Sequence, residues 1–579
     1  MDSPFDALAH ADAAASDAPQ PRVTRRAALL AGAVAGSVAA LLAAAVSLWA
    51  GQRFGGVITA QLLADRITGV TPVSVFGRVL QQLEENAKPL TLIGLTLAQA
   101  LAGAAIGAVY GLAWRRSAFR PRAGALLLGL AAWLILALAV APLGQIGALA
   151  RDAPGGATAT LLLSAASAAL FGLVTALAVP LLAGSREPAP VDLSRRRFAG
   201  GLGLAALVVP ALLAGGYTMR YALRLRRTSS ASPAPIADTV ADADDDGAEA
   251  AGDAGPFGFA GMPRFITPTD EFYVVSKNIV DPEVDGSSWT LEIDGLVRQR
   301  VILSLTDLLA RESVEFTSTL ECISNPIGGG YISNAVWRGI PLVTLLDEAG
   351  LLDGIVDLEL HAADGYVESI PLAEGLAPDT MLVHTMNGEP LNDKHGFPAR
   401  LIVPGIFGMK NVKWLTKIIA VDEDILGFWQ QRGWSDPAPV LTMSRLDVPG
   451  SQGRVIVGEP FVAGGVSFAG DKGISRVEVS FDGGDTWSDA ELSDVPNDLT
   501  WRLWRIEHTP VDEASFDMHV RATDGRGELQ TDERTPALPD GATGHHTIRV
   551  RVEGRDAASP PVPNTPIPAF REGVSGDGG

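Results

Sequence analysis

The chain has 579 residues, which is long enough for several domains with separate hydrophobic cores. Its 45 Lys and Arg residues against 66 Asp and Glu residues give a formal net charge of −21. A nucleic-acid partner is therefore not expected, because an acidic chain repels phosphate backbones. The single cysteine, Cys322, excludes an intrachain disulfide, a cysteine-rich zinc site and a covalently attached c-type haem.

Five apolar stretches each supply the roughly 20 residues needed to cross a bilayer. They cover residues 27–50, 91–113, 124–148, 158–183 and 198–219, and together predict a transmembrane bundle over residues 27–221. Arginines gather before the first stretch and in the second and fourth connections, which lie on one side if all five stretches span. The positive-inside rule makes that side cytoplasmic. We therefore expect a multi-pass protein of the plasma membrane, with residues 1–26 as a cytoplasmic tail and an extracytoplasmic C-terminal part.

Three further segments are distinguished by their composition. Arg195-Arg196-Arg197-Phe198, followed by apolar residues, resembles an internal twin-arginine export signal, and an ordinary positive-inside flank is the alternative. Residues 222–262 are mostly small, acidic and dotted with Pro and Gly, which predicts a flexible linker. Residues 554–579 are rich in Pro and Gly and predict a disordered tail.

The region between linker and tail contains short predicted strands and helices. WTLEIDGL, DLELHAADGY and ARLIVPG are typical of strands that end in turns, whereas ITPTDEF and SLTDLLARE are typical of helix starts. An α+β domain is predicted over residues 263–430. Alternating runs separated by Gly turns predict an immunoglobulin-like β-sandwich over residues 436–553. The fold class is thus multi-domain: a helical transmembrane bundle, an α+β domain and a β-sandwich.

Cys322 lies in TSTLECISNPIGGGY, after a predicted strand and before a glycine-rich loop. Free cysteines usually pack as small hydrophobic residues, and that role is the alternative here. A thiolate is also a soft ligand suited to a redox-active metal. The glycines 328–330 would let the backbone approach a bulky ligand. The surroundings of Cys322 therefore favour a metal ligand.

Four blocks in order resemble the molybdopterin-binding domain of the sulfite oxidase family. They are FITPTDEFYVVSKN (265–278), TLECISN (319–325), GYVESIPL (365–372) and MNGEPLNDKHGFPARLIVPGIFGMKNVKWLTKI (386–418). Residues 436–553 are similar to the dimerisation domain of the family, which implies a homodimer. The resemblance also implies a molybdenum–molybdopterin cofactor with Cys322 as the metal ligand and a catalytic residue. The cofactor-binding residues that it implies are Lys277, Asn278, His361, His395, Arg400, Lys410 and Lys413.

Two positions depart from the sulfite-oxidising members of the family. Pro326 stands where those members carry an arginine that binds the anionic substrate. His384 matches the position of a tyrosine that reaches the metal site, so His384 is expected to be catalytic here. Both changes disfavour sulfite, while the oxygen-atom-transfer class of reaction stays the prediction.

Three functions are therefore weighed. Oxygen-atom transfer by a membrane-anchored molybdopterin oxidoreductase leads, and the twin-arginine route suits it because that route exports folded, cofactor-loaded domains. A sulfoxide-type reductase on the same cofactor and a non-enzymatic cell-surface binding protein are the alternatives. None of the eight histidines lies in a predicted span, so the bundle offers no bis-histidine haem site and a separate electron-transfer partner is expected.

Overall fold

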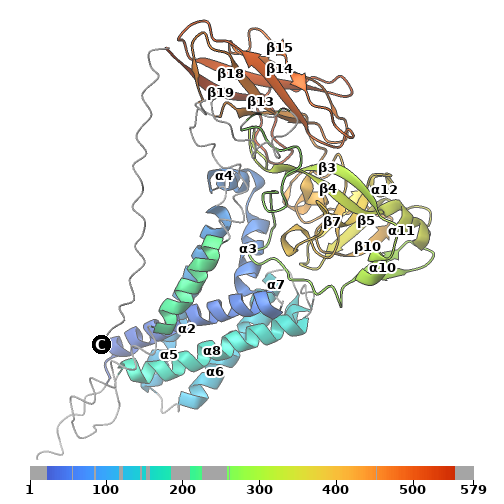
Figure 1. Cartoon of the computed structure of the whole chain (residues 1–579). Helices are drawn as coiled ribbons and strands as arrows, with labels where there is room; N and C mark the ends of the chain where they lie inside the picture. The colour runs from blue at the N-terminus through green and yellow to red at the C-terminus, as the bar shows by residue number, and fades with distance from the viewer. Residues whose placement is uncertain are drawn as a thin grey trace, which may run out of the picture.

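The structure, a computed structural model, describes residues 23–54, 57–83, 86–116, 121–143, 147–151, 157–183, 209–224, 257, 259, 261–450 and 453–554. Most of the predicted cytoplasmic tail, the twin-arginine segment, and most of the acidic linker and of the C-terminal tail lie outside these residues. Figure 1 shows a group of long helices, a β-rich domain beside its upper end and a second β-rich domain above.

Four helices are long and apolar enough to cross a membrane, and they match the first four predicted stretches. Their apolar surface on all sides is consistent with a membrane environment, because a long helix without a polar face is stable only in lipid or deep in a core. Only the end of the fifth stretch is described, and it belongs to a helix over residues 209–224. The four are α2 (Arg25–Phe54), α5 (Ala87–Arg116), α6 (Pro121–Ile135) continued by η2 (Leu136–Val140) and α7 (Ala141–Leu143), and α8 (Ala157–Ala183).

Glycines bring α2 and α5 into backbone contact. A Cβ added at Gly32 would collide with the carbonyl oxygen of Gly107, and one at Gly36 would collide with that of Gly103. Small residues four positions apart allow this approach, which supplies van der Waals contact where lipid gives no hydrophobic drive. The two helices therefore form a pair that side chains of ordinary size would force apart.

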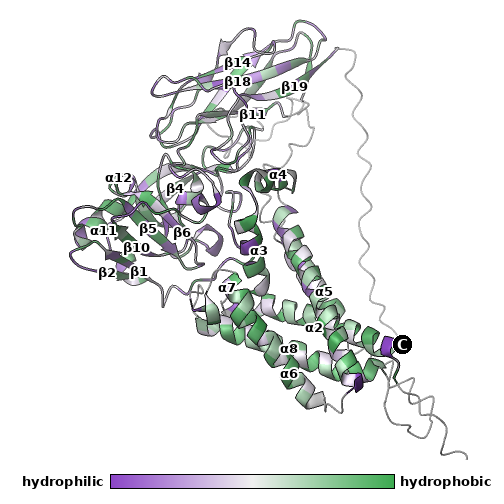
Figure 2. Ribbon diagram, turned by 180° about the vertical axis from the view of Figure 1, so that it is seen from behind, coloured by the Kyte–Doolittle hydropathy of each residue, from purple (hydrophilic) through white to green (hydrophobic). Residues whose placement is uncertain are grey.

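Two helices between the first two spans were not expected from the sequence. α3 (Thr59–Val70) leads from the bundle toward the β-rich domain, and α4 (Val73–Leu83) lies against that domain. Figures 1 and 2 show both helices between the bundle and the β-rich domain from opposite sides. Val73 and Phe76 of α4 pack against the core of that domain. The membrane part is thus docked on the β-rich domain as well as joined to it by the chain.

The first β-rich domain contains two sheets and a few short helices. One sheet has the order β2-β1-β10-β5-β6, and the other has the order β3-β4-β7-β8 with β9 paired to β7. The strands of the first sheet are β1 (Thr290–Gly295), β2 (Val301–Ser304), β5 (Asp357–Ala362), β6 (Val367–Pro371) and β10 (Leu415–Val421). Those of the second are β3 (Val314–Glu321), β4 (Ile332–Pro341), β7 (Met381–Met386), β8 (Glu389–Pro390) and β9 (Arg400–Ile402). The helices are α10 (Leu305–Leu309), α11 (Leu342–Ala349), α12 (Leu372–Gly375), η4 (Asp393–His395), η5 (Gly408–Lys410) and η6 (Gln430–Arg432).

Most local predictions for this domain are confirmed. WTLEIDGL, DLELHAADGY and ARLIVPG contain β1, β5 and β9, and SLTDLLARE begins α10 with a capping box between Ser304 and Asp307. The helix expected at ITPTDEF is wrong. The amides of Glu271 and Phe272 donate to the carbonyl of Pro268, but only a turn forms, because the chain then runs into the core, where Phe272 is buried.

The C-terminal domain also has two sheets, with the orders β11-β13-β17-β16 and β12-β19-β18-β14-β15. The immunoglobulin-type class expected for it stays a prediction. Trp501 joins this domain to the first one, since its amide donates to Thr319 Oγ1 (2.8 Å) and its indole donates to the Phe265 carbonyl (2.9 Å). The strands are β11 (Met443–Val448), β12 (Arg454–Ile456), β13 (Phe461–Phe468), β14 (Ile474–Ser480), β15 (Ser488–Asp489), β16 (Glu491–Leu492), β17 (Arg502–His508), β18 (Phe516–Asp524) and β19 (His546–Glu553).

Candidate functional site

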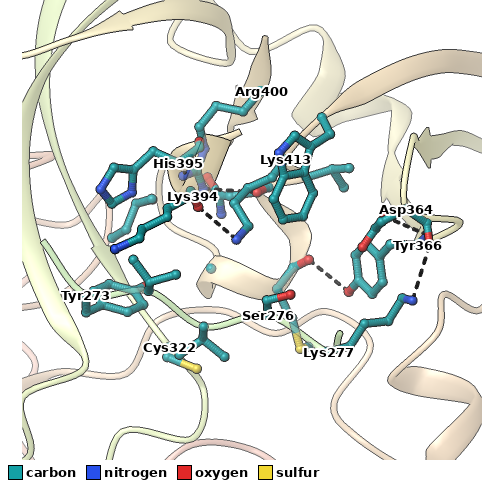
Figure 3. Close-up of a pocket in the computed structure, with 18 of the residues that line it drawn as sticks. Tyr273, Ser276, Lys277, Cys322, Asp364, Tyr366, Lys394, His395, Arg400 and Lys413 are labelled. Atoms are coloured by element: carbon teal, nitrogen blue, oxygen red, sulfur yellow. Dashed lines mark hydrogen bonds between the residues drawn. The ribbon is translucent and has the colours of Figure 1, made fainter. Parts of the chain in front are cut away.

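A cavity lies in the first β-rich domain, between the end of β3, the segment 272–277 and the segment 394–414 (Figure 3). It contains about 820 Å³ of atom-free space, its open mouth included. Trp429 and Trp434 line a further wall. The cavity therefore collects residues from all four sequence blocks that carried the family resemblance.

Cys322 faces this cavity immediately after β3. Its amide donates to the Tyr331 carbonyl (2.9 Å), and its Sγ lies 3.0 Å from Ser324 Oγ. Burial raises the pKa of the thiol, and the hydrogen bonds from Ser324 oppose that shift. A buried thiol of this kind is inert as a nucleophile but can exchange its proton for a metal ion.

The glycine-rich loop after Cys322 is held by the C-terminal domain. Arg445 Nη1 donates to the Gly329 carbonyl (2.9 Å). Gly328 has a φ of +74°, and a Cβ there would collide with the ring of His546. We expected glycines 328–330 to let the backbone approach a ligand. In the structure, Gly328 instead makes room for His546 of the C-terminal domain.

The other end of the cavity is cationic. Arg400 at the start of β9 is buried, and its terminal nitrogens donate to the carbonyls of His395 (3.2 Å) and Asn411 (3.1 Å). Its Nε is buried without a hydrogen-bond partner in the described part of the chain. Burial lowers the pKa of Arg400 to about 10. Lys413 Nζ donates to the Lys394 carbonyl (3.1 Å), and burial lowers its pKa to about 8.

His395 lies beside these cations as a neutral ring. Its Nε2 donates to the Thr269 carbonyl (2.8 Å), and burial lowers its pKa to about 4. A histidine that donates through Nε2 and carries no charge leaves Nδ1 as an acceptor. The ring therefore adds no positive charge to this end of the cavity.

Lys277 lines the cavity on the side of Asp364. Its Nζ donates to Asn278 Oδ1 (2.8 Å) and to the Asp364 carbonyl (3.4 Å). Asn278 does not line the cavity, since its Nδ2 donates to Asp364 Oδ2 (2.6 Å) and its side chain is buried. Asn278 thus orients Lys277 and Asp364 from behind.

Comparison with known proteins identifies the protein family to which this chain belongs. Residues 278–429 match the oxidoreductase molybdopterin binding domain, and residues 448–552 match the Mo-co oxidoreductase dimerisation domain. Sulfite oxidase of Gallus gallus is 30% identical to this chain over 322 residues, which cover 47% of this chain and 70% of that protein. This chain belongs to the sulfite oxidase family.

Other relatives align less completely. Mitochondrial sulfite oxidase of Rattus norvegicus is 29% identical, with 47% of this chain and 58% of that protein covered. An NADH nitrate reductase of Brassica napus is also 29% identical, with 46% of this chain and 36% of that protein covered. The chain thus spans little more than half of the rat relative. The molybdenum–molybdopterin cofactor predicted from the resemblance is confirmed by the family, and each matched region lies inside the corresponding predicted domain.

Besides Asn278, three residues implied by the sulfite oxidase resemblance do not line the cavity. Lys410 is 1% exposed, and its Nζ donates to Glu368 (3.2 Å), Asp436 (3.2 Å) and the Ser369 carbonyl (2.8 Å), so no donor is left for a phosphate. His361 Nε2 lies 3.3 Å from Glu359 on β5. His384 Nε2 lies 3.1 Å from Ser313 Oγ, and this histidine is not among the described residues that line the cavity, so its catalytic role stays a prediction.

Several cavity residues were missed, although they lie in or next to the quoted blocks. Tyr273 belongs to the first block and faces the cavity near Cys322 (Figure 3). A Cβ at Gly408 would lie 2.7 Å from Tyr273 Oη, so the Gly-Met-Lys turn needs glycine to admit this phenol. Burial raises the pKa of Tyr273 well above its ordinary value, and it therefore keeps its proton. Lys394 directly precedes His395, and Tyr366 is the second residue of the third block.

The charges of the cavity suit a cofactor of this family. Among the described residues that line it, Asp364 is the single acid, whereas Lys277, Lys394, Arg400 and Lys413 are cations. Buried cations are costly unless an anion compensates them, and the depressed pKa values of Arg400 and Lys413 report that cost. A cofactor that carries a phosphate would supply the anion, while Cys322 offers a soft ligand elsewhere in the same cavity.

Proposed function

We propose that this protein is a membrane-anchored molybdenum enzyme that transfers an oxygen atom. The observation that carries the proposal is one cavity with the Cys322 thiol on its wall, lined by four cations and a single acid among the described residues. The bound cofactor would supply two-electron redox chemistry. The transferred oxygen would come from water, with release of two protons and two electrons, when the substrate is oxidised, and would leave as water, with uptake of two protons and two electrons, when the substrate is reduced. Membership of the sulfite oxidase family and this cavity favour an enzyme over the binding protein that the sequence left open.

The residues divide into two groups by what they would hold. Cys322 would bind the metal through its thiolate. Arg400, Lys413, Lys394 and Lys277 would hold the phosphate and pterin, since a phosphate is best bound by guanidinium forks and lysine ammonium groups. His395 would accept one hydrogen bond beside them through Nδ1, since its Nε2 already donates to the Thr269 carbonyl.

Tyr273 would orient the substrate. Its hydroxyl stays protonated in the buried wall near Cys322 and can donate a hydrogen bond to a substrate oxygen. Phe272 and Leu320 contribute apolar surface to the same cavity. Pro326 brings neither a positive charge nor an amide donor to the loop after Cys322. These features support a neutral substrate over a small anion such as sulfite.

The location, oligomeric state and electron partner are inferred from the rest of the chain. Four apolar helices support membrane association, and the arginine-rich connections support a cytoplasmic N-terminus and an extracytoplasmic catalytic domain. The dimerisation-domain match supports a homodimer. A separate redox protein or small carrier would exchange electrons with the site.

Cofactor analysis of the purified full-length chain tests the proposal. After expression in a host that makes molybdopterin, we expect about one molybdenum and one pterin per chain, because one soft ligand and one phosphate-binding end define a single site. A cavity charge variant, Arg400→Ala, should hold less of both. Wild-type protein that folds in such a host but contains neither molybdenum nor pterin would overturn the proposal.

A further inference from the structure

Helix α4 of the membrane anchor packs behind a wall of the cofactor cavity. The Phe76 ring lies 6.0 Å from Trp429 and 6.4 Å from Trp434, measured between ring centroids. These two tryptophans line the cavity and stack on each other at 4.2 Å. Because close-packed side chains lose contacts when a neighbour is removed, Phe76 supports this wall from outside, as Phe428 does at 5.0 Å from Trp429.

The anchor also holds the segment that carries Lys277. The amide of Ile279 donates to Gln61 Oε1 of α3 (2.6 Å), and its carbonyl accepts from Tyr221 Oη (3.0 Å). The Ile279 side chain is 4% exposed and packs among apolar residues of the anchor, including Leu48 and Leu92. Two residues beyond Lys277, the backbone is therefore fixed on both sides by the membrane part.

Asp65 of the anchor helix α3 lies near two cations of the β-rich domain, Lys277 and Arg432. Gln61 Nε2 donates to Asp65 Oδ1 (2.7 Å), so one glutamine joins Asp65 to Ile279. The Asp65 carboxylate interacts with the charges of Lys277 and Arg432. The Lys277 ammonium and the Arg432 guanidinium both lie over the Phe428 ring, at 5.4 Å and 3.6 Å from its centroid. Asp65 thus links α3 electrostatically to Lys277 and Arg432, which both pack on Phe428.

We propose that the membrane anchor is a structural part of the cofactor site. Phe76 acts through Trp429 and Trp434, and Gln61 and Tyr221 act through Ile279 on Lys277. They are positioning residues: they keep two walls of the cavity in the shape that retains the cofactor. The inference rests on the proposed function, and it predicts that the docked helices slow the loss of the cofactor.

The test compares matched variants of the full-length chain in detergent. Tyr221→Phe removes the bond to Ile279 and a hydrogen bond with Gln52, whereas Tyr217→Phe, on the same helix, removes only a bond to Gln52 inside the anchor (2.9 Å), so the difference between them isolates the Ile279 bond. Phe76→Ala removes the support of the tryptophans, whereas Val79→Ala changes a residue of α4 that is 45% exposed. Pterin and molybdenum remaining on the protein are measured over time after gel filtration. We expect loss about three- to tenfold faster in Tyr221→Phe and Phe76→Ala than in their controls, as one hydrogen bond or packing contact is removed.

A double variant separates positioning from general destabilisation. If Tyr221 acts through Lys277, then Tyr221→Phe adds nothing to the rate of cofactor loss in a Lys277→Met background. Rates in Tyr221→Phe and Phe76→Ala equal to those of their controls would overturn the inference, as would full additivity with Lys277→Met. Wild-type protein without molybdenum would instead count against the proposed function.

Discussion

Lys410 and Lys413 lie three residues apart and have opposite electrostatic surroundings. Lys410 is enclosed with Glu368, which is 0% exposed, and its charge is matched there. Lys413 faces the cavity, and its Nζ lies 4.2 Å from the centroid of the Trp414 ring. Burial lowers the pKa of Lys413 to about 8. Lys410 therefore stabilises the fold, whereas Lys413 carries a charge that the phosphate of a bound cofactor would compensate.

Replacing each lysine by methionine should separate these two roles. Lys410→Met leaves the Glu368 carboxylate buried without its partner, and we expect a loss of about 3–5 kcal/mol in the free energy of unfolding. Lys413→Met removes an uncompensated cation, so the cofactor-free protein should unfold at a higher temperature than wild type at pH 7. It should also bind less cofactor. Thermal unfolding of the cofactor-free proteins measures both effects.

The gain in Lys413→Met should depend on pH. The folded protein holds this proton less tightly than the unfolded chain, with a pKa of about 8 against an ordinary 10.5. Wild-type stability therefore rises with pH between these values, because the unfolded state binds more protons. The difference in unfolding temperature between variant and wild type should be full below pH 8 and shrink toward pH 10. A difference that does not change with pH would contradict this account of Lys413.

Lys410 and Lys413 also show which site residues can be predicted from the sequence and which cannot. The block resemblance located Cys322, His395, Arg400 and Lys413, all of which line the cavity. It assigned Lys410 to the phosphate because a sequence block shows residue types without their partners. The partners Glu368 and Asp436 are 42 and 26 positions away in the chain, so only the tertiary structure reveals that Lys410 is already paired.

At the scale of elements, the long helices were predictable and their packing was less so. Apolar length alone defines a span, whereas the α2–α5 contact depends on the small residues Gly32, Gly36, Gly103 and Gly107. Their four-residue spacing is the signal that could have found this contact. α3 and α4 were missed because short amphipathic helices gain their stability from the surface on which they pack.

Gly107→Leu tests the helix pairing. Even a Cβ at this position would collide with the Gly32 carbonyl oxygen, so the helices must separate. We expect a loss of about 1–3 kcal/mol or more, seen as a lower unfolding temperature and a smaller monodisperse fraction in detergent. Gly94→Leu, in the same helix, is the control, because no atom lies within 4 Å of a Cβ there. Equal behaviour of the two variants would show that the α2–α5 contact is not tight.

At the scale of the whole molecule, the sequence predicts the order of the parts and makes no prediction of the contacts between them. The flexible linker expected over residues 222–262 would by itself leave the catalytic domain joined to the anchor by the chain alone. Instead, Gln61, Phe76 and Tyr221 fasten that domain to the anchor through contacts between residues far apart in the chain. Such long-range contacts have no signature in local composition.

The export route is a prediction about the whole molecule. Arg195 and Arg196 lie outside the described residues, and the sequence alone suggests a twin-arginine signal there. Replacing both with lysine keeps the positive charge and should strand the catalytic domain in the cytoplasm. Protease accessibility of the C-terminal part in spheroplasts measures this. Unchanged accessibility would favour an ordinary positive-inside flank.

The central claim is that Cys322 binds the molybdenum, and X-ray absorption at the metal edge tests it most directly. The measurement compares the cofactor-loaded full-length protein with Cys322→Ser, because a hydroxyl is a harder and poorer ligand than a thiolate. We predict that the variant keeps the fold, loses nearly all activity and shows one sulfur ligand fewer at the metal. The same sulfur count in both proteins would contradict the assignment of Cys322.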